Sequence, residues 1–168
     1  EVLKLSKRYS ASVKDAIFNL DFARKNGVAT ATELIFGLPG ETLESMKKAI
    51  NTTIALNFDS LALGSLWLLR GAELNEPKSR EAYQYRGQFM LGENALTVDG
   101  DFFSFEADEI VVSSKFFSYE EWVRFIQYQF LIQLMVYFGY SRELLYFGMR
   151  EGQLEITDIL DELLDNKD

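Results

Sequence analysis

The chain has 168 residues and a formal net charge of −9, and it contains neither cysteine nor histidine. Without cysteine it can form no disulfide, no zinc–thiolate site and no iron–sulfur cluster held by its own thiolates, and its acidity makes a nucleic-acid backbone a poor partner. Hydrophobic residues make up 48% of the sequence and aromatic residues 14%, which is typical of one globular domain or two small ones and excludes a disordered chain.

The first half of the sequence alternates between helical and strand patterns. Ser12 followed by Asp15 resembles a capping box, and apolar residues at helical spacing then predict a helix that ends near Gly27. Residues 30–36 predict a buried strand. Residues 57–59 predict a turn into a second buried strand over residues 60–69.

Between these strands the sequence predicts a helix that begins at Thr42 and Glu44. Its apolar stripe is Leu43, Met46, Ile50 and Ile54, and Lys47 and Lys48 are expected to face solvent. Strand, helix and strand form a βαβ unit, so we expect two parallel strands joined by a right-handed crossover.

After Gly71 the pattern changes. Residues 75–87 are polar and include Pro77, and residues 89–98 and 102–113 predict short strands. Ser118 and Glu121 form a capping box at the start of a helix that continues to about residue 138, and Ser141 starts another helix.

The carboxyl end of the chain predicts an amphipathic helix with an acidic face. Residues 151–168 hold seven acids and one base, and we interpret these charges as a solvated helix face. The apolar stretch at residues 130–140 is shorter than the about 20 residues of a bilayer span, so it predicts a buried helix or an interface and no membrane span. With no signal peptide visible, we expect a cytoplasmic protein.

The run Glu33-Leu34-Ile35-Phe36-Gly37-Leu38-Pro39-Gly40-Glu41-Thr42 is the most informative stretch. It predicts a buried strand that turns at glycine and proline directly into a helix. In α/β proteins, ligands lie at such corners, beyond the carboxyl ends of parallel strands. Two interpretations stay open: the glycines allow a ligand to approach the backbone, or they only make a tight connection.

The order of Val2-Leu3-Lys4, Arg8, an amphipathic helix and this run resembles the back half of a radical SAM barrel. It most resembles the branch in which a cobalamin-binding domain precedes the radical SAM domain. Gly71-Ala72-Glu73-Leu74 adds to the resemblance. The resemblance implies an α/β fold, with an incomplete radical SAM-type (βα) barrel portion over residues 1–74 and a variable, mainly α-helical region over residues 75–168.

The resemblance also implies a site. In the family the corner approaches the adenosine part of S-adenosylmethionine, so the candidate cofactor-binding residues are Gly37, Leu38, Pro39, Gly40, Glu41 and Arg8. For Glu41 the alternative is an acid that complements the helix dipole, and for Arg8 it is a surface charge. Two departures weaken the match: Arg70-Gly71-Ala72 replaces the usual Pro-Gly-Thr, and Glu33 stands where related members often have glycine.

The family's Cys-x-x-x-Cys-x-x-Cys loop, which holds a 4Fe-4S cluster, is absent. We therefore expect a C-terminal fragment that is inactive alone and retains no cofactor, from a parent enzyme that uses S-adenosylmethionine, a 4Fe-4S cluster and cobalamin. Its partners would be the missing N-terminal barrel and the cobalamin-type domain. We also predict a homo-dimer, formed through the open strand edge at residues 30–36 or through the helix at residues 130–140. The alternative function is a non-catalytic protein-interaction module with an α/β core.

Overall fold

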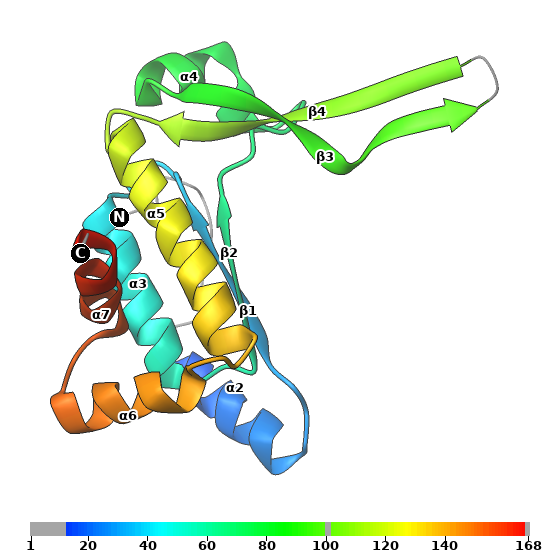
Figure 1. Ribbon diagram of the computed structural model, residues 1–168. Helices are drawn as coiled ribbons and strands as arrows, with labels where there is room; N and C mark the ends of the chain where they lie inside the picture. The colour runs from blue at the N-terminus through cyan, green and yellow to red at the C-terminus, as the bar shows by residue number, and fades with distance from the viewer. Residues whose placement is uncertain (1–12, 100–101, 167–168) are drawn as a thin grey trace.

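The computed structural model describes residues 13–99 and 102–166, which form a mixed α/β structure (Figure 1). In chain order its elements are α2 (Val13–Lys25), β1 (Ala31–Phe36), α3 (Leu43–Leu56), β2 (Ser60–Ser65), the 3₁₀ helix η1 (Glu73–Asn75), α4 (Pro77–Tyr83), β3 (Arg86–Asp99), β4 (Phe102–Ser113), α5 (Tyr119–Ile132), the π-helix η2 (Gln133–Tyr137), α6 (Arg142–Gly152) and α7 (Ile156–Asp165). The described strands form two sheets of two strands each and no closed barrel. Over the same residues, no helix combines the length and apolarity that a bilayer crossing requires.

The predicted βαβ unit is present. β1 and β2 pair in parallel, with Leu34 opposite Leu63, and α3 connects them. Thr42 begins α3 as predicted. The Ser45 hydroxyl accepts a hydrogen bond from the Thr42 backbone N–H at 3.0 Å, and the Thr42 hydroxyl accepts one from the Ser45 backbone N–H at 3.1 Å. Asn57 ends the helix in a left-handed conformation with φ of 55°.

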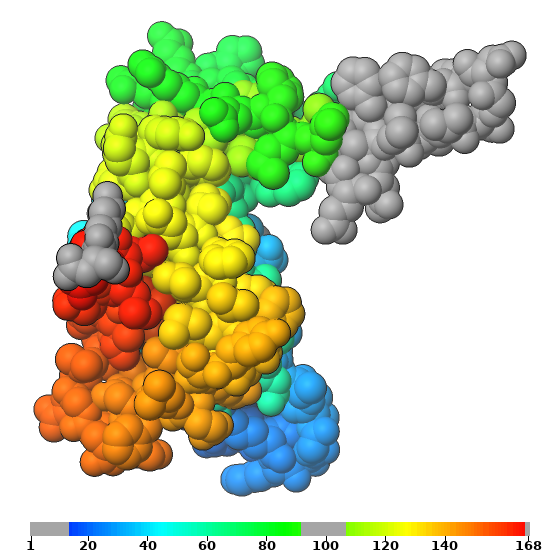
Figure 2. All heavy atoms as spheres, in the orientation of Figure 1, coloured from blue at the N-terminus to red at the C-terminus, as the bar shows by residue number. Residues whose placement is uncertain are grey.

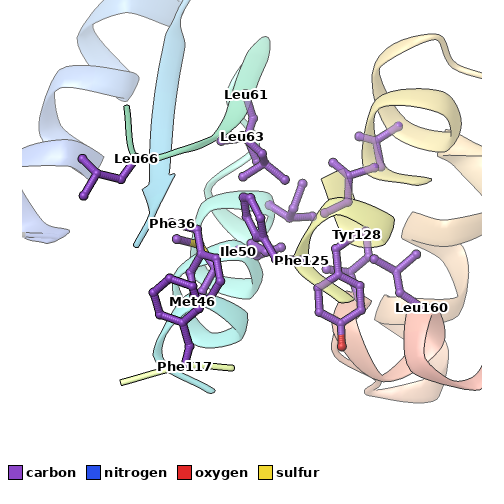
Figure 3. Close-up of a cluster of buried hydrophobic side chains, with 14 of the residues drawn as sticks. Phe36, Met46, Ile50, Leu61, Leu63, Leu66, Phe117, Phe125, Tyr128 and Leu160 are labelled. Atoms are coloured by element: carbon purple, nitrogen blue, oxygen red, sulfur yellow. The ribbon is translucent and has the colours of Figure 1, made fainter. Parts of the chain in front are cut away.

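The hydrophobic core lies where α3 and α5 pack against one face of the β1–β2 sheet (Figure 3). Phe36 is fully buried, and its ring centroid lies 4.6 Å from that of Phe117 and 4.7 Å from that of Phe125. α5 starts at the predicted capping box of Ser118 and Glu121. Phe36 of β1 and the helical stripe of α3 therefore meet in this core. The prediction that residues 30–36 are buried is wrong for Ala31 and Glu33, which are exposed because the opposite face of the sheet is not covered by α3 or α5.

The prediction that Lys47 faces solvent is wrong. Its Nζ lies 2.7 Å from Asp161 Oδ2 on α7, and only 19% of the Lys47 side chain is exposed. Asp161 also accepts a hydrogen bond from the Tyr128 hydroxyl of α5 and lies 3.6 Å from Arg124. The acidic face of α7, predicted to be solvated, therefore also binds this helix to α3 and α5. In Figure 2, α7 (red) lies against α5 (yellow).

The chain beyond β2 differs most from the prediction. β2 ends at Ser65 rather than at residue 69, and Trp67 then forms an antiparallel bridge with Ile110 of β4. The polar segment contains α4, with Pro77 at a first-turn position that suits proline. The two predicted short strands form one long antiparallel hairpin, β3–β4, which extends away from the helices (Figure 1). From Ser118 onward the chain is helical, as predicted, and its first helix there is α5.

The side of β1 away from β2 is open. No described strand pairs with that edge. α2 carries exposed apolar side chains, with Phe18 70% and Phe22 61% exposed, and Leu20 is the only buried residue among residues 14–25. α2 is instead held by Arg24, which donates to the carbonyl of Leu56 at 2.7 Å and to the carbonyl of Asn57 at 2.9 Å.

Candidate functional site

The corner between β1 and α3, residues 37–40, has a backbone that requires glycine. Gly37 has φ of 110° and Gly40 has φ of 84°, values that residues with a side chain rarely adopt. A Cβ on Gly37 would also lie 3.2 Å from the Cβ of Leu66, which is closer than ordinary van der Waals contact. Conformation and close packing thus both fix the residue type at this corner.

A groove of about 540 Å³ lies beside this corner. Glu33 and Ile35 alternate along β1 with Leu34 and Phe36, and Phe36 is buried in the core, so Glu33 and Ile35 project from the sheet face opposite α3. The groove therefore lies on that face, near the carboxyl ends of both strands; we call it the β-face groove. It is lined by Glu33 and Ile35 of β1, Leu38 of the corner, Gly64 and Ser65 of β2, and Trp67 and Leu69 beyond β2.

The β-face groove is mainly apolar with one carboxylate. Glu33 is exposed, and Trp67 retains 43% of its surface in contact with solvent. A Cβ built on Gly64 would meet nothing within 4 Å, so the strand leaves open space there. This combination suits a ligand with a flat apolar part and a cationic group. The described residues contain no group of three or more acidic, histidine or cysteine side chains placed to hold a metal ion.

The wall formed by the residues after β2 is fixed by a polar network. Asn75 donates to the carbonyl of Leu68 at 2.8 Å and to the carbonyl of Leu69 at 3.0 Å. Arg80 of α4 donates to Asn75 Oδ1 at 2.7 Å and forms an ion pair with Glu109 of β4. The two charges stabilise each other, so the pKa of Arg80 is raised and that of Glu109 is lowered. The network ties the groove wall to the base of the hairpin.

Glu41 has an environment that the helix-dipole interpretation does not describe. The residue is only 7% exposed, and its Oε2 has no hydrogen-bond partner among the described residues. Burial raises the pKa of the Glu41 carboxyl to about 7, although hydrogen bonds from the backbone of Gly37 and Leu38 act in the opposite direction. Glu41 is therefore a buried acid packed against the corner, and it does not line the groove.

The structure brings most of the predicted site residues together. Residues 37–40 form the corner, Leu38 reaches the groove and Glu41 folds beneath it, whereas Arg8 lies outside the described residues. Gly64 and Trp67 also line the groove and were not among the predicted site residues. No local pattern placed Trp67 on the same groove as Glu33 and Ile35.

No protein-family model matches the chain. The chain is 28% identical over 165 residues to the cobalamin-dependent radical SAM methyltransferase TokK of Streptomyces tokunonensis. That match covers 96% of this chain and 22% of TokK, so the chain spans about a fifth of the length of this relative. The similarity indicates a distant relationship between this chain and a region of that enzyme.

Proposed function

We propose that this chain is the C-terminal part of a radical SAM enzyme of the cobalamin-dependent branch, and that the β-face groove forms one wall of its S-adenosylmethionine site. The observation that carries the proposal is the position of the groove, at the carboxyl ends of two parallel strands and beside the glycine corner. The similarity to TokK along 96% of the chain supports it. The remaining barrel strands and a cobalamin-binding domain would belong to the rest of the parent protein.

The groove residues fit the chemistry of S-adenosylmethionine. The carboxylate of Glu33 can attract the sulfonium or amino group, and Leu38 and Trp67 offer apolar surface to the adenine ring. The open space at Gly64 admits a flat group against the sheet. When bound, S-adenosylmethionine would supply the alkyl group that is transferred or that forms the radical. The 4Fe-4S cluster does not fit this chain, which has no cysteine to ligate it, so its ligands would come from elsewhere in the parent.

Calorimetric titration with S-adenosylhomocysteine tests the site on the 168-residue chain. We expect saturable binding to the unmodified chain and a loss of about tenfold or more in affinity, about 1.4 kcal/mol, for Gly64→Val, because the new side chain fills the groove. Gly148→Ala on α6 is the matched control, since a Cβ there also meets nothing within 4 Å but lies away from the groove residues. Absence of saturable binding, or equal affinity in the Gly64 variant, would contradict the proposal.

One observation favours the second function, a non-catalytic interaction module. Large apolar side chains are exposed around η2 and α6: Phe130 is 64% exposed, Phe138 66%, Tyr140 77% and Leu144 72%. Such side chains suit a protein interface. The reading frame upstream of Glu1 separates the two functions: a triple-cysteine loop there supports the enzyme, and a different domain supports the module.

A further inference from the structure

One wall of the β-face groove is a short loop, residues 68–75. Three of its apolar residues line the groove: Leu69, Ala72 and Leu74. The middle of the loop is a tight turn, in which the Ala72 N–H donates to the Leu69 carbonyl at 3.1 Å. The ends are joined by the side chain of Asn75, whose Nδ2 donates to the carbonyl of Leu68 at 2.8 Å and to that of Leu69 at 3.0 Å. A side-chain amide therefore closes the loop that forms this wall.

The orientation of the Asn75 amide is fixed by its partners. Arg80 of α4 donates to Asn75 Oδ1 from Nε at 2.9 Å and from Nη2 at 2.7 Å. A guanidinium group only donates hydrogen bonds and a carbonyl only accepts them, so an amide rotated by half a turn would lose all of these contacts. Arg80 thus directs the Nδ2 of Asn75 towards the two loop carbonyls.

Arg80 is held in turn by Glu109 of β4. The two side chains make a double hydrogen bond, with Nη1 3.0 Å from Oε1 and Nη2 donating to Oε2. The Glu109 side chain lies over Gly87 of β3, where an added Cβ would come within 2.2 Å of Oε1. The Glu109 carbonyl also accepts the Leu68 N–H at 2.7 Å. Glu109 therefore holds the loop through its backbone and, by way of Arg80 and Asn75, through its side chain.

We propose that Asn75 is a positioning residue for the ligand of the β-face groove: its amide closes the loop so that the loop's apolar residues form the groove wall, and the Arg80–Glu109 pair holds that amide in the required orientation. Trp67 also lines the groove and directly precedes Leu68, so a loop that opens at Leu68 changes the surroundings of the Trp67 indole. The effect on ligand affinity rests on the proposed function, whereas the effect on the loop does not.

Asn75→Asp separates the two sides of the amide. The aspartate has the same shape and keeps an oxygen that accepts from Arg80. It has no N–H to donate, so it turns a second oxygen towards the carbonyls of Leu68 and Leu69. This variant therefore releases the loop and leaves the pairing of Arg80 with Glu109 available.

Proton–nitrogen NMR of the 168-residue chain reads the loop directly. The chain has two tryptophans: Trp67 beside the loop, and Trp122 of α5, whose indole donates to the Ser65 hydroxyl at 2.9 Å. In Asn75→Asp we expect the amide signal of Ala72 and the indole signal of Trp67 to shift, because the loop that surrounds them opens. The indole signal of Trp122 should stay in place, and it reports whether the change is local.

Asn26→Asp is the matched control. The Asn26 Nδ2 also donates to a backbone carbonyl, that of Phe22 at 2.7 Å, and the substitution adds the same charge away from the groove residues. It should leave the loop signals unchanged. Glu109→Gln is the second variant: it keeps the length and an acceptor but loses the charge that holds Arg80, so the same signals should shift by less. It decides the question if Asn75→Asp does not fold.

Calorimetric titration connects the loop to the ligand. Affinity for S-adenosylhomocysteine should be about tenfold lower in Asn75→Asp, because two hydrogen bonds that shape the wall are lost. The proposal is overturned if the Ala72 and Trp67 signals stay in place, if the Trp122 indole shifts as much as that of Trp67, or if the affinity does not change. A chain that binds no S-adenosylhomocysteine contradicts the proposed function, and the NMR signals still decide whether Asn75 positions the loop.

Discussion

Replacing Glu41 with glutamine should remove a pH-dependent loss of folding stability. The carboxyl has a pKa of about 7 in the folded chain against an ordinary value of 4.5. At about 1.4 kcal/mol per pKa unit, this difference corresponds to about 3 kcal/mol. Below pH 4.5 the group is protonated in both the folded and unfolded chain and has no effect. As the pH rises towards 7, the unfolded chain ionises first, so the free energy of unfolding of the wild type falls.

Urea denaturation followed by circular dichroism can measure this effect. Between pH 5.5 and 8.5, the free energy of unfolding of Glu41→Gln should rise relative to wild type by about 2 kcal/mol, because the other titrating groups are common to both chains and cancel. A constant offset between the two curves is also expected, since the buried amide has no partner for its N–H groups. Glu44→Gln should run parallel to wild type. A difference between Glu41→Gln and wild type that stays constant over this pH range would refute the reasoning.

Three further outcomes are expected. Asp161→Asn should lower the free energy of unfolding by about 1–3 kcal/mol in urea denaturation, because it weakens the contacts with Lys47 and Tyr128; a change below that range would mean that apolar packing alone holds α7. Anaerobic reconstitution with iron and sulfide should give no stoichiometric cluster and no cleavage of S-adenosylmethionine, and a visible charge-transfer band would contradict this. Sedimentation equilibrium at micromolar concentration should show a dimer, formed through the open edge of β1 or through the helix at residues 130–140, whereas a strictly monomeric chain would argue against both interfaces.

The parts of the fold that the sequence predicts are those determined by near neighbours. Thr42 and Ser118 cap their helices through residues three positions away. The corner at residues 37–40 was predictable for the same reason, since glycine and proline act on their own turn. Lys47 shows the limit: its helical position predicts exposure, and the acid that covers it lies 114 residues further along the chain.

The hairpin and the groove depended on longer-range pairing. A register shift between Leu91 and Leu96 interrupts the alternation of β3, so the sequence suggested short strands where the structure has one long pair. The early end of β2 follows from the bridge between Trp67 and Ile110, and no local pattern encodes a partner 43 positions away. Because Trp67 lines the groove only through this bridge, its role could not be predicted from its neighbours.

Residues 60–68 belong to two sheets, and this has a mechanical consequence. Their first part pairs with β1, and their last part exchanges hydrogen bonds with β4, from Leu68 N to Glu109 O at 2.7 Å and from Val111 N to Leu66 O at 2.8 Å. The base of the long hairpin is thus joined by hydrogen bonds to the groove wall, and the hairpin projects from that point (Figure 1). A displacement of the hairpin base would therefore be transmitted directly to Leu66 and Trp67.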